Sequence, residues 1–105
     1  MHPQIIQYPN GGGFFARHWH SLTPQRLGFI VLLSKPGVDF KNGGTVFEIN
    51  GEAVSVGERH DIGDILIWRY DYPHWVTQSD LSDKFNWDSS DGRWVATFAF
   101  FDPFA

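Results

Sequence analysis

Residues 45–56 read TVFEINGEAVSV. Thr45–Ile49 is a β-rich run, Asn50-Gly51 follows it, and Glu52–Val56 returns as its partner. Asn and Gly tolerate a positive φ, so this pair predicts a tight two-residue turn. The segment is therefore expected to fold as a β-hairpin.

Short apolar runs on both sides of the hairpin continue the pattern. No run has a sustained helical period, and 11 glycines and six prolines punctuate the chain. Residues 57–61 and 79–92 are polar and predict loops. Strands are expected at residues 14–20, 29–33, 64–70, 74–78 and 93–101, with Asp102-Pro103 ending the last one. The pattern predicts an all-β fold, a double-stranded β-helix (jelly roll) of about eight antiparallel strands with little helix.

The bulk composition limits the classes of protein to consider. A chain of 105 residues with 42% hydrophobic content predicts one domain, residues 1–105, with a single core. A net charge of −4 argues against a nucleic-acid partner, because phosphate binding needs a basic face. The absence of cysteine excludes disulfides and cysteine-based zinc sites. No signal peptide is visible, and no apolar run approaches the roughly 18 residues of a membrane span, so a cytoplasmic protein without a membrane partner is expected.

Three histidines are the candidate metal ligands. On a strand, residues i and i+2 point to the same face, so His18 and His20 are expected to present their rings side by side. His74 on a neighbouring strand would complete a three-nitrogen face for iron(II), zinc, nickel or manganese. The alternative interpretation is a pair of surface histidines on an edge strand. His2 and His60 lack a partner at such spacing and are expected in a disordered terminus and a solvated loop.

Arg93 opens the last predicted strand, directly after Asp91-Gly92. A guanidinium on the inner face of a barrel is costly unless it meets a carboxylate or phosphate, which it can grip through two hydrogen bonds. Arg93 is thus a candidate anchor for an acidic substrate or cosubstrate. The alternative is an arginine at a strand end that reaches solvent.

The remaining charged residues of the predicted strands are expected to be structural. Arg69 shares the face of Ile65 and Ile67, and a bridge to Asp71 or Glu48 is expected. Three carboxylates near the predicted turns and strand ends are expected to be structural or solvated rather than metal-binding: Asp39, Glu48 and Asp64.

The order of these motifs resembles the iron(II)/2-oxoglutarate-dependent dioxygenases, especially their prolyl-hydroxylase-like branch. The matching elements are Tyr8 to His20, the apolar run at 29–33, Gly43-Gly44-Thr45-Val46-Phe47, Gly63 before His74, and Gly92-Arg93-Trp94. The resemblance implies that iron(II) is bound by His18, His20 and His74. It also implies that Arg93 holds the far carboxylate of 2-oxoglutarate, and that a small molecule or peptide is hydroxylated. His20 stands where that family has an aspartate, so the site loses one negative charge.

Cupins, which share the double-stranded β-helix, are the alternative family. Gly12 followed by His18-Trp19-His20, and Gly63 eleven residues before His74, resemble the two cupin motifs, but the cupin glutamate ligand is absent. That resemblance implies a non-catalytic module that binds a metal or a small acid. A purely structural jelly roll is the third hypothesis. Exposed sheet edges and many aromatic residues favour a homodimer.

Overall fold

The computed structural model of the chain describes residues 2–20, 25–80 and 83–101. These residues form an all-β fold of eight strands with one short 3-10 turn. No helix in this part of the chain is long and apolar enough to cross a membrane. The strands are β1 His2–Tyr8, β2 Gly13–His18, β3 Gln25–Leu32, β4 Thr45–Ile49, β5 Glu52–Ser55, β6 Ile65–Arg69, β7 His74–Ser79 and β8 Arg93–Phe101, and the turn η1 is Gly57–Arg59.

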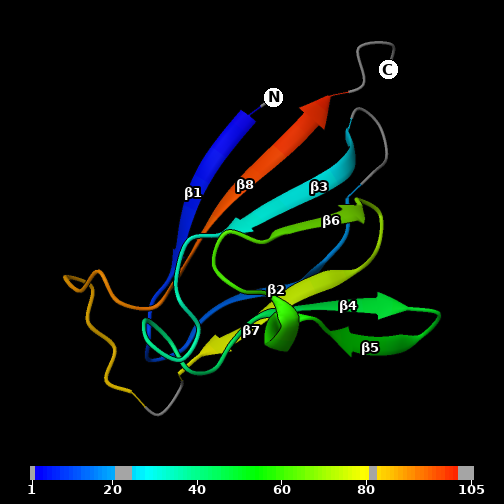
Figure 1. Cartoon of the computed structure of the whole chain (residues 1–105). Helices are drawn as coiled ribbons and strands as arrows, with labels where there is room; N and C mark the ends of the chain where they lie inside the picture. Colours follow the sequence, from blue (N-terminus) through cyan, green and yellow to red (C-terminus); the bar gives the residue numbers. More distant parts are fainter. Residues whose placement is uncertain (1, 21–24, 81–82, 102–105) are drawn as a thin grey trace.

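The strands form two four-stranded sheets, which lie one above the other in Figure 1. Their orders are β1-β8-β3-β6 and β2-β7-β4-β5. β1 pairs with β8, β2 with β7, β3 with β6 and β4 with β5, always antiparallel. This nested pairing, in which a long hairpin is wound around itself, is the jelly-roll topology. The predicted all-β double-stranded β-helix is confirmed.

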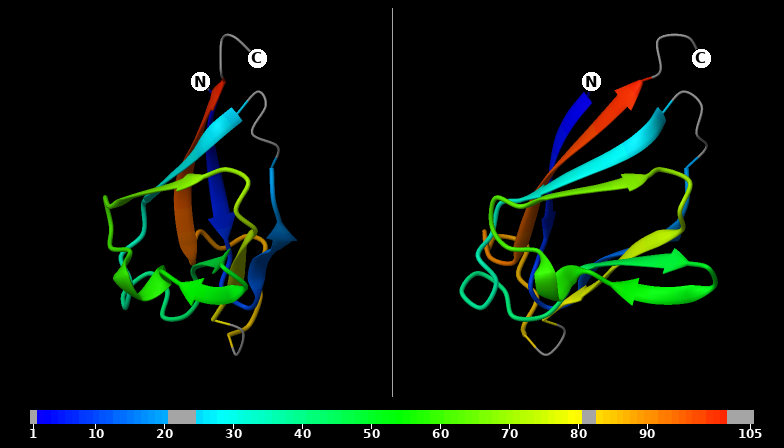
Figure 2. Two further views of the ribbon diagram at one scale, coloured as in Figure 1. Left: turned by 90° about the vertical axis from the view of Figure 1, so that its right-hand side faces the viewer. Right: turned by 45° about the vertical axis from the view of Figure 1, so that its right-hand side comes forward.

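The β4-β5 hairpin is the tip of this nested arrangement. Asn50 and Gly51 have φ angles of 53° and 81°, as the tight turn predicted from the Asn-Gly pair requires. Figure 2 shows the hairpin at one end of the second sheet, and the ends of the described N- and C-terminal strands near each other in the first sheet. The β-hairpin predicted for residues 45–56 is therefore confirmed.

The core lies between the two sheets. Alternate residues of β3, Ile30 and Leu32, are buried, and Val95 of β8 is completely buried beside them. Tyr8 of β1, Phe40 from the β3–β4 connection and Val76 of β7 complete the cluster. Inward-pointing side chains of the strands also line the site described below, among them Ile30 and Val76.

Two expectations for the N-terminal part are wrong. His2 does not lie in a disordered terminus, because it begins β1, which pairs with β8 from His2 opposite Ala99 to Tyr8 opposite Arg93. The strand expected at residues 14–20 ends at His18. β1 carries a proline and two glutamines, so its own pattern is weak, and its hydrogen bonds come from a strand about ninety residues away. The predicted end of β8 at Asp102-Pro103 lies outside the described residues.

Gly92, directly before β8, is a position where only glycine fits. Its φ is +96°, and an added Cβ would collide with the Tyr8 carbonyl oxygen and approach the Asn10 nitrogen to 3.0 Å. Replacing Gly92 by alanine is expected to lower the free energy of unfolding by about 2–4 kcal/mol, measured by urea denaturation. Gly63 is the matched control, with φ +83° and open space around it; Gly63→Ala should cost only about 1 kcal/mol. Equal costs for the two variants would contradict the collision at Gly92.

Candidate metal centre

The two sheets bring His18, His20 and His74 together. His18 is the last residue of β2 and His74 the first of β7, and the two are directly opposite each other in the antiparallel pair. His20 lies beyond the end of β2, where its backbone N–H donates to the Tyr70 carbonyl at 3.2 Å. One nitrogen from each ring lies within 4.8 Å of the others. The clustering expected from the sequence is observed, although His20 reaches it from beyond the end of β2 rather than from within the strand.

Ring contacts fix the relative positions of the three imidazoles. The His18 and His74 ring centroids are 4.1 Å apart, and those of His18 and His20 are 5.0 Å apart. The His20 ring stacks flat on Tyr70, with centroids 3.8 Å apart and an interplanar angle of 9°. Stacking on Tyr70 therefore positions the His20 ring, whereas strand pairing positions His18 and His74.

The hydrogen bonds of His18 and His74 determine which ring nitrogen is free. The His18 Nδ1 lies 2.8 Å from the Ala16 carbonyl oxygen, and the His74 Nδ1 lies 2.8 Å from that of Tyr72. A carbonyl only accepts, so each Nδ1 carries the proton and donates it, which leaves Nε2 unprotonated. Histidines that bind metals are oriented in this manner, with the second nitrogen held by a carbonyl or carboxylate.

Burial favours the neutral form of His20 and His74 by lowering the pKa of each. Burial lowers the pKa of His74 to about 4, against a smaller upward effect of its bond to Tyr72. Burial also lowers the pKa of His20, and the neighbouring His18 lowers it further. Metal ions bind the unprotonated imidazole, so at neutral pH these ligands need not lose a proton first.

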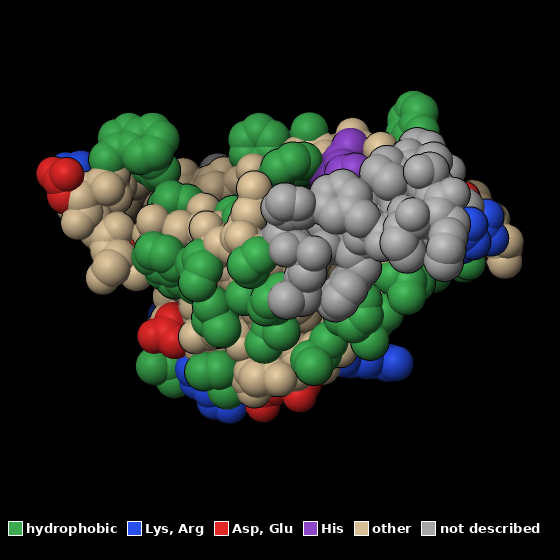
Figure 3. Space-filling model, turned by 90° about the horizontal axis from the view of Figure 1, so that it is seen from above, with side chains coloured by type: hydrophobic (Ala, Val, Ile, Leu, Met, Phe, Trp, Pro, Cys, Tyr) green, Lys and Arg blue, Asp and Glu red, His purple; other side chains and the backbone are tan. Residues whose placement is uncertain are grey.

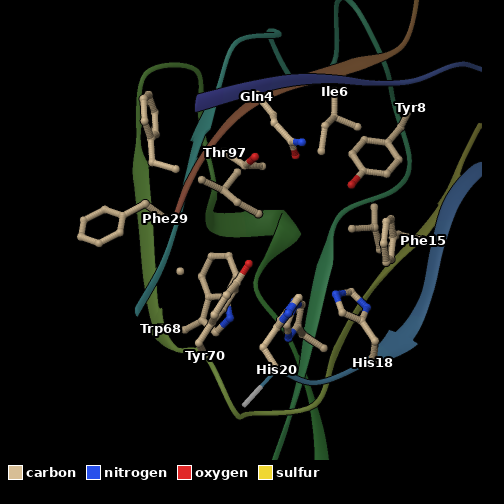
Figure 4. Close-up of a pocket in the computed structure, with 15 residues that line it drawn as sticks. Gln4, Ile6, Tyr8, Phe15, His18, His20, Phe29, Trp68, Tyr70 and Thr97 are labelled. Atoms are coloured by element: carbon tan, nitrogen blue, oxygen red, sulfur yellow. The ribbon is translucent and has the colours of Figure 1, made fainter. Parts of the chain in front are cut away.

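A cavity of about 300 Å³ lies beside the histidines and between the sheets. In Figure 4, His18 and His20 lie at one side of it, Trp68 and Tyr70 along another, and Gln4, Ile6 and Tyr8 across from them. Histidine side chains also reach the surface next to hydrophobic side chains in the view of Figure 3. The candidate ligands thus sit at the junction of a hollow interior and the outside.

Arg93 is buried, with 1% of its surface exposed, so the alternative of a strand-end arginine reaching solvent is wrong. Its Nη2 donates to the Thr45 hydroxyl at 3.3 Å, and its guanidinium carbon lies 5.4 Å from the centre of the Tyr8 ring. Nη1 is buried without any hydrogen-bond partner, and no carboxylate of the described residues forms a salt bridge with Arg93. Burial lowers the pKa of this arginine. Arg93 is therefore a buried cation without a counter-ion among the described residues. A bound carboxylate would supply that counter-ion.

Arg93 does not itself line the cavity, but Tyr8 connects the two. The Tyr8 ring lies over the guanidinium, and its hydroxyl points into the cavity (Figure 4). Burial raises the pKa of Tyr8 and of Tyr70, so both hydroxyls keep their protons at neutral pH. Sequence reasoning missed both tyrosines and Trp68 as site residues. The alternation of Leu66 and Trp68 along β6 with Tyr70, the residue after it, was the available signal.

The four other charged residues singled out from the sequence, Arg69, Glu48, Asp39 and Asp64, have structural partners. Arg69 pairs with Asp71 at 2.8 Å, which confirms the expected bridge, and Glu48 pairs with Arg17 at 2.7 Å. The Asp39 carboxylate accepts the Lys35 backbone N–H and the Asp64 carboxylate that of Asp61, at 2.6 and 2.9 Å. None of these three expected structural carboxylates joins the histidine group.

His60 is not a solvated loop residue as the sequence suggested, because it is buried with 7% exposure. Its Nε2 lies 2.8 Å from the Asp64 carbonyl oxygen, so the bond closes the loop between η1 and β6. This bond satisfies one ring nitrogen, while Nδ1 is buried without a hydrogen-bond partner.

Comparison with known proteins finds similarity in structure but not in sequence. No protein-family model and no curated protein matches the sequence. A prolyl-4-hydroxylase from Pseudomonas putida superposes with a TM-score of 0.70 and 17% identity over 94% of this chain. The chain spans about half of that protein, 49% of its length. An RmlC-like cupin protein from Desulfovibrio desulfuricans gives a TM-score of 0.48 and 16% identity, over 92% of this chain and 71% of the other. The chain therefore has the fold of the prolyl-4-hydroxylase.

Proposed function

We propose that this chain is the core of an iron(II)/2-oxoglutarate-dependent oxygenase. The observation that carries the proposal is the convergence of His18, His20 and His74, with the free Nε2 atoms of His18 and His74 beside an interior cavity. The shared fold with a prolyl-4-hydroxylase supports it.

The residues fit a divalent metal. Three neutral imidazoles are a donor set that iron, zinc, copper and nickel accept. Two of them are already oriented by backbone carbonyls, and the third is fixed by stacking on Tyr70. A site whose ligands are held before the metal arrives loses little conformational freedom on binding.

The residues also fit a dicarboxylate. Arg93 has an unpaired Nη1, and no acidic side chain among the described residues neutralises it. A carboxylate of 2-oxoglutarate would supply both the missing acceptor and the missing charge. The other end of the molecule would face a metal whose three ligands carry no charge, so the site as a whole favours an anion.

Each part of the chain then has a role in the reaction. Bound iron(II) would supply the oxidative chemistry, in which dioxygen and 2-oxoglutarate give succinate, carbon dioxide and a hydroxylated C–H bond of the substrate. His18 and His74 donate from Nδ1, which in the neutral ring leaves Nε2 as the nitrogen that can bind the metal, and Tyr70 holds His20 in place. Arg93 anchors the cosubstrate, and the apolar walls of the cavity limit the access of water.

The test is the conversion of 2-oxoglutarate to succinate by the purified protein with iron(II) and ascorbate, in the absence of any added substrate. Oxygenases of this kind are expected to show slow succinate formation that stops when a chelator removes iron. Binding of 2-oxoglutarate to the metal-loaded protein is measured in parallel by calorimetry. Absence of both succinate formation and 2-oxoglutarate binding would overturn the proposal.

A second candidate function is a module that binds a metal or small acid without turnover. The observation in its favour is the donor set: no carboxylate joins the three histidines among the described residues. Iron bound only by neutral ligands has a different reduction potential from iron that is also bound by a carboxylate. Metal and 2-oxoglutarate binding without succinate formation would select this candidate.

A further inference from the structure

The outward face of the first sheet is apolar across all four of its strands. Ile30, Leu32 and Val95 point into the core, so the residues next to them in β3 and β8 point to the other side of the sheet. Strand register aligns such outward residues in two rows across β1, β8, β3 and β6. One row is Ile5, Ala96, Val31 and Ile65, and the other is Pro3, Phe98, Phe29 and Ile67. In Figure 4 the Phe29 ring points away from the cavity, as this arrangement requires.

This outward face is open to solvent. Large aliphatic side chains on it expose 42–66% of their surface, namely Ile5, Leu27, Leu33, Ile65 and Ile67. Phe29, Val31 and Trp94 lie between them and are half-buried. A single exposed apolar side chain is ordinary on a protein surface, whereas a contiguous apolar face marks a contact with a partner.

The size of the outward face suits a contact between proteins. Four strands at a spacing of about 4.8 Å, each with about seven residues, give a face of roughly 20 by 23 Å. That is on the order of 450 Å² in projection, and side chains that stand on the sheet expose more area than the projection. Each partner in a standard interface buries about 600–1,000 Å². The outward face therefore approaches the area that a stable dimer needs.

The charge on the outward face also limits the kind of partner. All eight residues of the two rows are apolar, and ion pairs lie near the two ends of β6. Arg69 pairs with Asp71 at 2.8 Å, and Lys35 pairs with Asp61 at 3.0 Å. The two rows thus offer no opposite charge to an acidic or basic partner, and they lack the lysines and arginines that flank a lipid-binding face. An uncharged apolar sheet face is matched by another face of the same kind, which a second copy of this chain supplies.

We propose that the outward face of the first sheet is the contact surface of a homodimer, in which the same face of a second copy packs against it. Two sheets packed face to face, about 10 Å apart, bury both apolar surfaces at once. A two-fold axis through such a contact makes it identical for both partners and closes the assembly at two chains. The cavity and the histidines lie on the inner side of the sheet, so the contact leaves the candidate metal centre free. The inference does not depend on the proposed function.

The mass of the purified chain in solution tests the dimer. Sedimentation equilibrium is measured from about 1 to about 200 µM, since interfaces of this size class reach micromolar affinity or better. The wild type is expected to approach twice the 12.0 kDa mass of the chain as the concentration rises. A monomer at every concentration would overturn the proposal and leave the face to a different partner. Assembly beyond two chains would overturn the closed two-fold contact.

Ile67→Lys tests whether the outward face is the contact. The change places a charge opposite Phe29 in the second row, where the dimer would bury it without a partner. The dissociation constant of the dimer is expected to rise by at least about 100-fold. Ile5→Lys, on the opposite edge strand β1, should have the same effect and keeps the test available if Ile67→Lys does not fold.

Phe14→Lys is the matched control for these variants. Phe14 lies on β2, an edge strand of the second sheet, and is 58% exposed, compared with 53% for Ile67 on the edge strand β6. The control is expected to keep the dissociation constant of the wild type. An equal loss of the dimer in Phe14→Lys, or a dimer that survives both Ile67→Lys and Ile5→Lys, would overturn the assignment of this face.

Discussion

Replacing His74 by alanine is expected to abolish the stabilisation of this protein by iron(II). A ligand that binds only the folded state stabilises it by about 2.7 kcal/mol at a concentration one hundred times its Kd. For a chain of this size that gain corresponds to a rise in Tm of about 10 °C or more. His74 contributes a buried Nε2 whose orientation is fixed by Tyr72, so its removal leaves only two of the three ligands.

The measurement is thermal unfolding under anaerobic conditions, with and without iron(II), for wild type and variant. His60→Gln is the matched control, since His60 is also buried but lies outside the histidine group. The control is expected to retain the full rise in Tm on addition of iron, even if its metal-free Tm is lower. A rise in Tm that persists in His74→Ala, or one that is absent from the wild type, would contradict the metal centre.

Replacing Arg93 by methionine is expected to have opposite effects on stability and on binding. Arg93 is only 1% exposed and has no counter-ion among the described residues, and its Nη1 lacks a hydrogen-bond partner there. Burying a charge without compensation is costly, and replacement of buried charged groups by apolar residues is often stabilising by about 1–4 kcal/mol. Arg93→Met should therefore raise the urea midpoint of the ligand-free protein. The same change should weaken 2-oxoglutarate binding by at least about 30-fold, the loss of a charge-assisted contact worth 2 kcal/mol or more.

Two further variants sharpen this result. Arg93→Lys keeps the charge but loses the planar fork, so it should bind 2-oxoglutarate more weakly than the wild type and more tightly than Arg93→Met. Arg69→Met, at an exposed arginine paired with Asp71, should change neither property by much. Destabilisation of the protein by Arg93→Met, together with unchanged 2-oxoglutarate affinity, would mean that the arginine is purely structural.

Local features of the sequence sufficed to predict much of the architecture. The Asn50-Gly51 turn, the apolar β3 and the long β8 were all visible, because turn chemistry and side-chain periodicity act between near neighbours. β1 was not predicted. Its residues alternate only weakly, and its hydrogen-bonding partner β8 lies at the other end of the chain.

The candidate site was predicted in its residues but not in its geometry. His18 and His20 were expected on one strand, yet β2 ends at His18, and contacts with Tyr70 bring His20 to the group. The partnership of His18 with His74 depends on the register between β2 and β7. Sheet register between strands so distant in sequence is selected by packing over the whole domain, which no local pattern contains.

The sequence by itself predicted the all-β fold, the hairpin turn at Asn50-Gly51, and the candidate site residues His18, His20, His74 and Arg93. Only the tertiary structure decided that the imidazoles converge beside a cavity, and that Arg93 is buried without a counter-ion among the described residues. The physical reason is that strand and turn preferences arise from neighbouring residues. Burial and unpaired polar groups arise only when the two sheets close over each other.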